Sequence, residues 1–417
     1  MLINSKYIIG PHFVFSLFNS AMFQLKSLLN NKPFILTLWF GLSLFAIVKG
    51  VLIGDATTHN YNNYIIYKHN YLNLIHLHSL FGPQPEYYFD LNHYGPVFAL
   101  VIAPFAWLPD KIGVILWVFF NAWILYKAIM MLPLKQSACL AILLINANSM
   151  MGSSGNVEVN PLITALIIFS FIFIRRQQDF WAALAIILGT AIKLYGIVGL
   201  AFFFFSDNKV KLILSLLFWS AVLFVLPMLI SSPGYIIQTY HDWYPDLQLK
   251  NAANLVSTRG YVCVMGMISK IFHYKNLPNI VVLLPALVLF LVSLTRLKYW
   301  RNLQYQLLTL ASVLIFTVIY SSGSEPPTYI IAFIGVGIWF INQSRPIAAF
   351  NWSLFIFALL ISSFGNSDVI PRPIRINYIL PYALIALPCF LVWLKIAYEM
   401  LTRKFENDEV VVRTKLQ

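Results

Sequence analysis

Long apolar runs limit what this chain can fold into more than any other feature of its sequence. The first of them, residues 33–53, is long enough to cross a bilayer, which takes about 20 helical residues. Hydrophobic residues make up 59% of the 417 residues and charged residues only 10%, whereas a soluble domain carries about 25% charged residues. The sequence therefore predicts a polytopic membrane protein.

The order of these runs predicts an all-α fold of about 12 transmembrane helices in one domain, residues 1–400, with a cytoplasmic tail at 401–417. Several runs have only 13 to 16 residues, which is too short to cross a bilayer alone. Broken backbone at membrane depth is tolerated where it lines a cavity, so we expect a cavity that opens outward. The expected spans are 33–53, 112–132, 138–151, 160–174, 180–192, 194–206, 212–230, 279–294, 305–320, 328–341, 347–364 and 378–400.

Basic residues indicate how this bundle is oriented. The net charge of +13 comes from Lys and Arg that are scattered over short connections between spans, where such residues mark the cytoplasmic side. We therefore expect no nucleic-acid partner, and we expect the long polar segments 54–95 and 231–278 to face outside. We expect juxtamembrane helices in the first outer loop, and Pro96 suits the first turn of one of them, a juxtamembrane or re-entrant helix within 93–109. The segment 1–29 lacks the order of a cleavable signal and is expected along the inner membrane surface.

Asp55 is the first candidate for catalysis, because it is the only carboxylate between Leu2 and Pro85 and follows the first span directly. An ionisable group at the mouth of an intramembrane cavity is by default a functional hypothesis. A carboxylate there can act as general base toward a sugar hydroxyl, with His59 and Tyr61 to orient it or bind sugar. The alternative is an interfacial aspartate that caps the next helix, with aromatic neighbours at the membrane surface.

Four further candidates interrupt apolar surroundings. Glu158 and Asn160 lie in "GNVEVNP" and can bind a polar ligand, although Asn160 also suits an N-cap ahead of Pro161. Lys193 stands between two half-length spans, where it is either a point charge for phosphate or a side chain that reaches toward the interface. Glu325 is a second carboxylate at outer depth, or a cap.

Metal ligation and disulfide bonding receive little support from the sequence. His76 and His78 lack a convincing third ligand, and the three cysteines, Cys139, Cys263 and Cys389, are far apart. We expect no metal and no cofactor.

Several segments together resemble glycosyltransferase family 87, a family of bacterial integral membrane enzymes with the GT-C fold. The resemblance covers most of the chain. Two positions differ from the pattern of many members, which have glutamine in place of Asn156 and a histidine in the late outer loop around Glu325. The segments that carry the resemblance are 55–71, "YGPVFALVIAPFAWLP" beginning at Tyr94 with the following "LWVFFNAW", "SGNVEVNPLI", "AIKLYG" and "SSGSEPPTYIIAFIGVGIWF".

The resemblance implies transfer of a sugar, often mannose, from a polyprenyl-phosphate donor on the outer side of the bacterial cytoplasmic membrane. It implies Asp55 as the catalytic base and Lys193 as a contact to the lipid phosphate. We expect an inverting transfer of mannose or another hexose, with Arg259, Arg372 or Arg375 as further cations for the leaving phosphate. The expected partners are the lipid-linked donor, a glycan or glycolipid acceptor, and the membrane. The expected substrate-binding residues are His59, Tyr61, Tyr94, Asn156, Glu158, Asn160, Lys193, Arg259 and Glu325.

Two other classes of protein share some of these features. A transporter or lipid flippase also builds substrate sites from short broken spans. It would, however, place polar residues on both sides, whereas here they gather in the outer loops. A polysaccharide polymerase also has long outer loops with arginines. Consumption of a polyprenyl-phosphate sugar by purified protein, with no gradient present, separates these classes.

Overall fold

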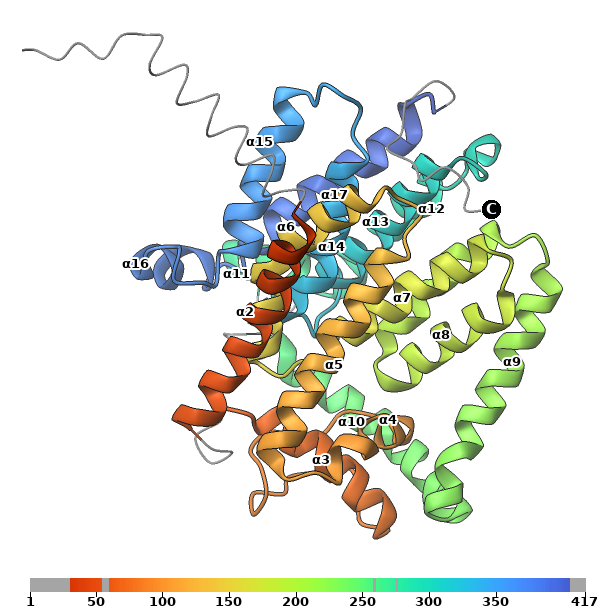
Figure 1. The fold of residues 1–417 in the computed structure, drawn as a ribbon, viewed down its shortest axis with the longest axis vertical. Coiled ribbons are helices and arrows are strands. Elements are labelled where there is room, and N and C mark those ends of the chain that lie inside the picture. Colours follow the sequence, from red (N-terminus) through yellow and green to blue (C-terminus); the bar gives the residue numbers. More distant parts are fainter. Residues whose placement is uncertain (1–30, 55–59, 258–259, 275–276, 406–417) are drawn as a thin grey trace, which may run out of the picture.

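A computed structural model describes residues 31–54, 60–257, 260–274 and 277–405 of the chain. These residues form helices and turns, and none of them belongs to a strand, so the expected all-α fold is confirmed for this part of the chain (Figure 1). The segment 1–29, Asp55, His59, Arg259 and the tail beyond residue 405 lie outside the described residues.

Among the described residues, four helical segments are long and apolar enough to cross a membrane alone. They are α2 (Lys32–Ile53), α5 (Asp110–Met130), α6 (Gln136–Gly155), and α9 (Lys209–Val225) together with η3 (Leu226–Ile230). The number of twelve spans therefore stays a prediction. The shorter apolar helices are α4 (Pro96–Ala106), α7 (Asn160–Arg175), α8 (Asp179–Ile192), η2 (Leu194–Phe205), α12 (Asn279–Ser293), α13 (Leu303–Ile319), η5 (Pro326–Thr328) with α14 (Tyr329–Ile341), and α15 (Ala349–Ala358) with η6 (Leu359–Ser363).

Most expected boundaries agree with the structure within three residues, but two were wrong. The run expected at 138–151 is part of the 20-residue helix α6, because the small polar residues Ser153 and Ser154 are buried and continue the helix. The run expected at 378–400 begins later, since α17 (Ala386–Thr402) follows the short helices α16 (Arg372–Ile374) and η7 (Arg375–Ile379). Small η4 (Leu297–Tyr299) lies between α12 and α13.

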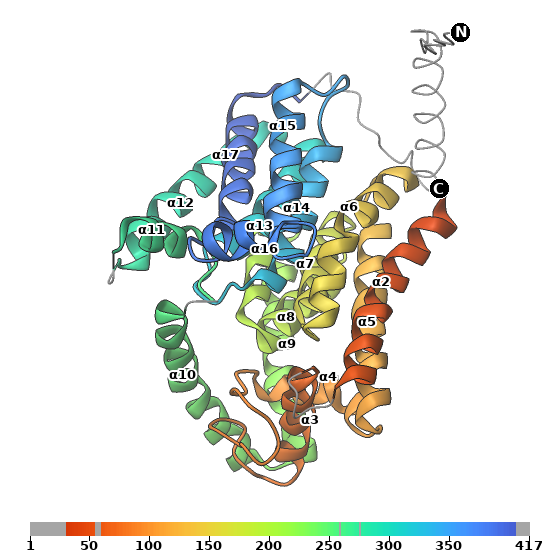
Figure 2. The same cartoon turned by 90° about the vertical axis from the view of Figure 1, so that its left-hand side faces the viewer.

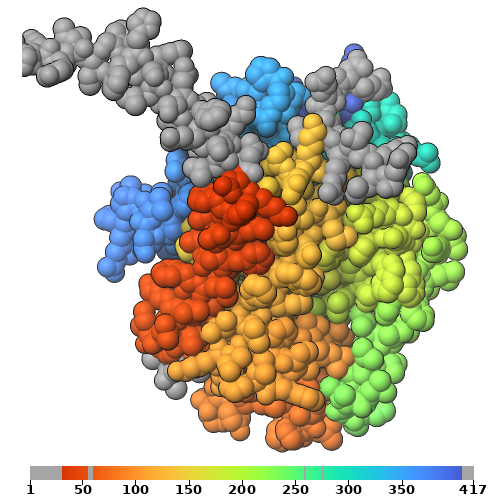
Figure 3. Space-filling view, viewed as in Figure 1, coloured from red at the N-terminus to blue at the C-terminus, as the bar shows by residue number. Residues whose placement is uncertain are grey.

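The helix α14 forms the centre of the bundle. Its residues from Tyr329 to Phe340 are all buried, as expected for a helix that is apolar on every side. It packs against α13, α6, α7 and α17. Figures 1 and 2 show it inside the bundle, whereas α2 lies on the outside. In Figure 3 α2 covers one face beside α5, and its apolar residues Phe45, Leu52 and Ile53 are 62%, 79% and 74% exposed.

One end of the bundle is closed by α3 (Asn62–Ile75), α4 and α10 (Pro233–Val256), which lie together in Figures 1 and 2. Pro96 occupies the first turn of α4, as predicted. The Tyr64 hydroxyl donates to the carbonyl of Phe105 at 2.7 Å, and Lys68 Nζ lies 2.6 Å from Asp110 Oδ1. These contacts attach α3 to α4 and α5.

Helix α10 and the short helix α11 (Val264–Phe272) were not expected from the sequence, because 231–278 was predicted only as a long polar segment that faces outside. The sequence signal for α10 was a helix-capping pattern and not an apolar run. Ser232 caps α10, because its hydroxyl accepts a hydrogen bond from Tyr235 N, and Pro233 lies in the first turn. Contacts to the first polar segment hold α10 in place. His93 Nδ1 lies 2.7 Å from Asp246 Oδ2, and Trp243 Nε1 donates to the carbonyl of His93 at 2.9 Å.

A break between α8 and η2 separates two short apolar helices. Lys193 stands at this break in an extended conformation, with φ −149° and ψ 128°. The two helices then approach so closely that a Cβ on Gly196 would lie 2.2 Å from backbone atoms of Gly189 and Thr190. Glycine at position 196 therefore allows the close backbone contact that fixes where Lys193 lies.

Replacement of Gly196 by alanine is expected to destabilise the protein and to displace Lys193. A methyl group cannot be placed there without moving backbone, and overpacking of this kind costs about 1–3 kcal/mol. The thermal midpoint of the purified Gly196→Ala protein in detergent should fall. The matched control is Gly41→Ala in α2, where an added Cβ meets nothing within 4 Å. Equal midpoints for the two variants would contradict the close contact.

Candidate functional site

A hydrogen-bonded chain joins Lys193, Asn160 and Glu158. Lys193 Nζ donates to Asn160 Oδ1 at 3.0 Å, and Asn160 Nδ2 donates to Glu158 Oε2 at 2.9 Å. The start of α7 thus lies beside the end of α8. The N-cap alternative for Asn160 is wrong, because Val159 occupies the cap position and the fully buried Asn160 amide connects the two charged groups.

Three tyrosines, Tyr67, Tyr94 and Tyr195, lie near these hydrogen-bonded residues. We call the six residues together the polar cluster: Tyr67, Tyr94, Glu158, Asn160, Lys193 and Tyr195. The hydroxyls of Tyr67 and Tyr94 lie 3.3 Å apart, and their rings meet edge to face at 5.1 Å. Lys193 Nζ lies 4.7 Å from the centre of the Tyr195 ring, a cation–π contact. Tyr67 and Tyr195 were not among the candidates predicted from the sequence, although Tyr195 follows Lys193 by two residues in "AIKLYG".

The charge of Glu325 acts on the same groups. The pKa of Glu158 is raised to about 7, chiefly because the side chain is buried. The positive charge of Lys193 lowers this pKa, and the negative charge of Glu325 raises it. Burial also raises the pKa of Tyr94 to about 12, so its hydroxyl stays protonated at neutral pH. A carboxyl with a pKa near 7 is suited to general acid or base work. Glu325 is also the N-cap residue of η5, where its N–H donates to Thr328 Oγ1 at 3.3 Å.

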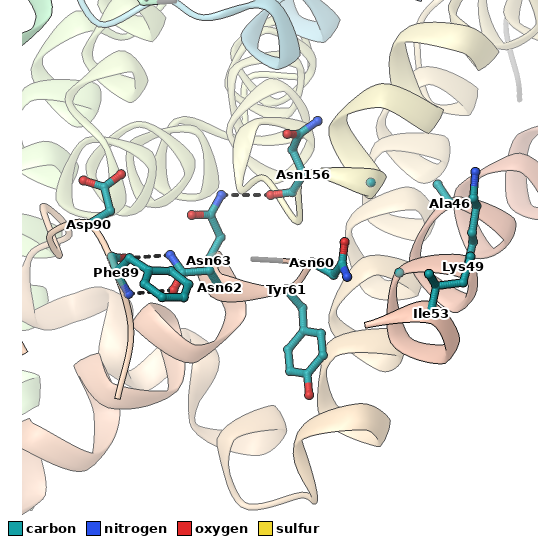
Figure 4. A pocket seen from close by; sticks show the side chains of 12 residues that line it. Ala46, Lys49, Ile53, Asn60, Tyr61, Asn62, Asn63, Phe89, Asp90 and Asn156 are labelled. Atoms are coloured by element: carbon teal, nitrogen blue, oxygen red, sulfur yellow. Dashed lines mark hydrogen bonds between the residues drawn. The ribbon is translucent and has the colours of Figure 1, made fainter. Parts of the chain in front are cut away.

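A pocket of about 500 Å³ lies between α2 and the segment around the start of α3, and Asn156 in its lining is two residues before Glu158 of the polar cluster (Figure 4). The Asn63 side chain crosses from α3 and donates to the carbonyl of Asn156 at 2.8 Å. The residues that line this pocket are Ala46, Lys49, Gly50, Ile53, Asn60, Tyr61, Asn62, Asn63, Phe89, Asp90, Gly155 and Asn156.

Lys49 is a cation in this pocket that sequence analysis missed. It is exposed and lies one turn from the end of α2, whose neighbouring residues Leu52 and Ile53 are also exposed. A lysine within an apolar span was the available signal. Tyr61 lies in the same pocket and occupies the N-cap position of α3.

A second, smaller pocket of about 210 Å³ lies on the other side of Asn156, which lines both. Its walls combine hydroxyl and amide side chains with apolar residues and the carboxylate of Asp368. Asn148 Nδ2 donates to the carbonyl of Ser363 at 2.7 Å, and the hydroxyls of Ser149 and Ser363 lie 3.1 Å apart. Pro326 and Pro327, which follow Glu325, form another part of the wall.

The structure thus brings together Tyr94, Glu158, Asn160, Lys193 and Glu325, and it places Tyr61 and Asn156 at the adjoining pocket. Asp55, His59 and Arg259 lie outside the described residues. The first two belong to the segment between Gly54 and Asn60, and Ile53 and Asn60 line the larger pocket. Arg375 pairs with Asp368 at 2.9 Å, at the edge of the smaller pocket.

The part of the chain that the structure describes holds no group of three or more His, Cys, Asp or Glu side chains that could bind a metal. Its three cysteines are buried as free thiols.

Comparison with known proteins relates the chain to a family of enzymes. The model of glycosyltransferase family 87 matches residues 92–322, which is more than half of the chain. This range includes Tyr94, Asn156, Glu158, Asn160 and Lys193, and it ends shortly before Glu325. No curated protein matches the chain.

The carboxyl of Glu158 is expected to titrate near pH 7. Its infrared carboxyl band should be present below that pH, disappear above it, and be missing from Glu158→Gln. Because this pKa is raised from 4.5, the folded protein should lose stability relative to Glu158→Gln as pH rises toward 7. Lys193→Met should move the midpoint upward, since Lys193 lowers it, and Lys250→Met should move it less. A midpoint between pH 4 and 5 would contradict the burial of this group.

Proposed function

This chain belongs to glycosyltransferase family 87, and on that premise we propose that it transfers a sugar from a polyprenyl-phosphate donor to an acceptor hydroxyl. The family makes it a membrane glycosyltransferase. The donor class, a hexose such as mannose, the GT-C fold and a site on the outer side of the bacterial cytoplasmic membrane are parts of the proposal.

The observation that carries the proposal is the position of Lys193 between two short apolar helices, held by Asn160. A lysine ammonium is a compact point charge that suits phosphate. The helices on either side are apolar enough to face lipid, so a phosphate attached to a lipid chain can approach this cation. A soluble sugar nucleotide would have no need of an apolar approach.

The larger pocket suits the donor and the smaller pocket suits the acceptor. Lys49 lies in the larger pocket close to exposed apolar residues of α2, which favours a lipid-linked molecule there. The smaller pocket offers neutral hydroxyl and amide groups, which favour a hydroxyl-rich acceptor such as a glycan. Asn156 lines both pockets, so the two substrates would meet at Asn156, which is two residues before Glu158.

In the proposed reaction the acceptor oxygen attacks the anomeric carbon, and the bond from that carbon to the phosphate oxygen breaks. Polyprenyl phosphate leaves, and Lys193 offsets the negative charge that it gains. The configuration at the anomeric carbon inverts. Asp55 takes the proton of the acceptor hydroxyl; it follows α2 directly, and Gly50 and Ile53 of that helix line the larger pocket. Glu158 is the second candidate for this proton, because burial raises its pKa to about 7.

The direct test uses purified protein in lipid nanodiscs, without a membrane gradient, and polyprenyl-phosphate mannose or another polyprenyl-phosphate hexose. We expect release of polyprenyl phosphate, slowly to water and faster when a membrane glycan extract supplies acceptors. Lys193→Ala should raise KM for the donor, because the cation that holds the phosphate is lost. Unchanged donor dependence in this variant would remove Lys193 from the donor site.

Asp55→Asn keeps the shape of the side chain and removes its basicity. General-base catalysis contributes about 10²–10⁴-fold, so the rate of transfer should fall by about that factor while donor binding is kept. Asparagine caps a helix about as well as aspartate, so a purely structural Asp55 predicts an active variant. Glu158→Gln in the same assay tests the second candidate, and near-normal turnover of Asp55→Asn with a large loss in Glu158→Gln would assign the base to Glu158.

A further inference from the structure

A basic pocket lies at the opposite end of the bundle from the polar cluster. Its volume is about 570 Å³, and three connections form it: from α7 to α8, from η2 to α9, and from α12 to α13. In Figure 1 the labels of α7, α8, α9 and α12 locate the helices that these connections join. The lining residues are Arg175, Gln177, Phe204, Phe205, Ser206, Asp207, Lys209, Leu297, Lys298, Trp300, Arg301 and Gln306.

Positive charge dominates this pocket. Four cations, Arg175, Lys209, Lys298 and Arg301, face one lining carboxylate, Asp207. Asp207 lies 3.5 Å from Arg301, but both side chains are largely exposed, and an exposed pair of this kind contributes little. Among the described residues a second carboxylate, Asp179, lies behind Ser206, whose hydroxyl donates to it at 2.9 Å. Without Lys298, the lining cations Arg175, Lys209 and Arg301 still outnumber the two carboxylates of the described residues, Asp207 and Asp179, so a surplus of positive charge remains among them.

Hydrogen bonds hold the pocket in shape. The Arg175 guanidinium donates to Gln306 Oε1, and Gln306 Nε2 donates to the carbonyl of Trp300 at 2.5 Å. Lys209 Nζ donates to the carbonyl of Ser206 at 3.1 Å, beside the start of α9. The arrangement is thus a built recess, and it differs from basic residues scattered over a surface.

One wall of the recess is apolar and faces outward. The rings of Phe204 and Trp300 lie 5.1 Å apart, and Trp300 Nε1 is held by the carbonyl of Leu294 at 2.8 Å. Phe204 is 41% exposed and Leu297 is 62% exposed, so the wall continues onto apolar surface. A ligand that fits both the cations and this wall carries a negative head and an apolar chain.

We propose that this recess binds the phosphate headgroup of an anionic phospholipid, with the acyl chains along the exposed faces of η2 and α12. Basic pockets between membrane helices bind anionic lipid headgroups in other proteins, and aromatic residues commonly lie at headgroup depth. The inference does not depend on the proposed transfer reaction. With the orientation expected from the sequence, the lipid belongs to the cytoplasmic leaflet.

Native mass spectrometry tests the site. Delipidated protein is mixed with equal amounts of palmitoyl-oleoyl phosphatidylglycerol and palmitoyl-oleoyl phosphatidylcholine, and the retained lipids are counted. We expect wild-type protein to retain phosphatidylglycerol preferentially. A cation near a membrane surface strengthens the binding of anionic lipid about fivefold, so Lys209→Ala/Arg301→Ala, which removes two exposed lining cations, should weaken this preference by about 30-fold. Arg301→Ala alone should weaken it by about fivefold, and the Arg301 side chain is 93% exposed, so this variant should fold.

The matched control is Arg176→Ala/Arg345→Ala, which removes the same charge from exposed positions outside the lining of the recess. We expect the control to keep the preference for phosphatidylglycerol. An equal loss in the control would mean general surface attraction and would overturn the site, as would an unchanged preference in the double variant. Displacement of phosphatidylglycerol by millimolar glycerol 3-phosphate would show that the recess recognises a free anion, and it would overturn the lipid as ligand.

Discussion

The charge of Lys193 is the constraint on which the arrangement of the candidate site depends. Lys193 is half-buried, and a charge withdrawn from water in this way is stabilised by pairing or hydrogen bonds, for which apolar helices offer few partners. Here the Asn160 amide accepts from the ammonium and donates to Glu158. The same burial raises the pKa of Glu158 to about 7. A requirement for charge compensation thus also gives the site a carboxyl that can exchange protons near neutral pH.

The backbone around Lys193 serves this arrangement. Gly189 and Gly196 let α8 and η2 approach closely, and the break between these helices leaves Lys193 extended beside the start of α7. At the same end of the bundle, α10 is fixed across the first polar segment by its contacts to His93. These contacts hold the segment that carries Tyr94, whose hydroxyl lies 3.3 Å from that of Tyr67. Rigid support of this kind suits a transfer that depends on the positions of two substrates.

The two ends of the bundle differ in chemistry. One end combines carboxylates, amides and tyrosine hydroxyls around two adjoining pockets, whereas the other end holds a recess with surplus positive charge and an aromatic wall. A protein that handles a lipid-linked substrate at one membrane surface gains from a fixed depth and tilt in the bilayer. A bound anionic lipid at the opposite surface would supply such an anchor.

The sequence by itself determined the all-α class, most helix boundaries and the separate candidates Glu158, Asn160, Lys193 and Glu325, because apolar runs and isolated charges are local signals. It did not reveal α10, which has no long apolar run. Whether Asn160 caps a helix or connects two charges depends on what lies opposite it, and only tertiary packing decides that. The smaller pocket joins Asn148 and Ser363, which are 215 residues apart, and the basic recess joins three distant connections. Such sites arise from how the helices pack, and no single stretch of sequence encodes that.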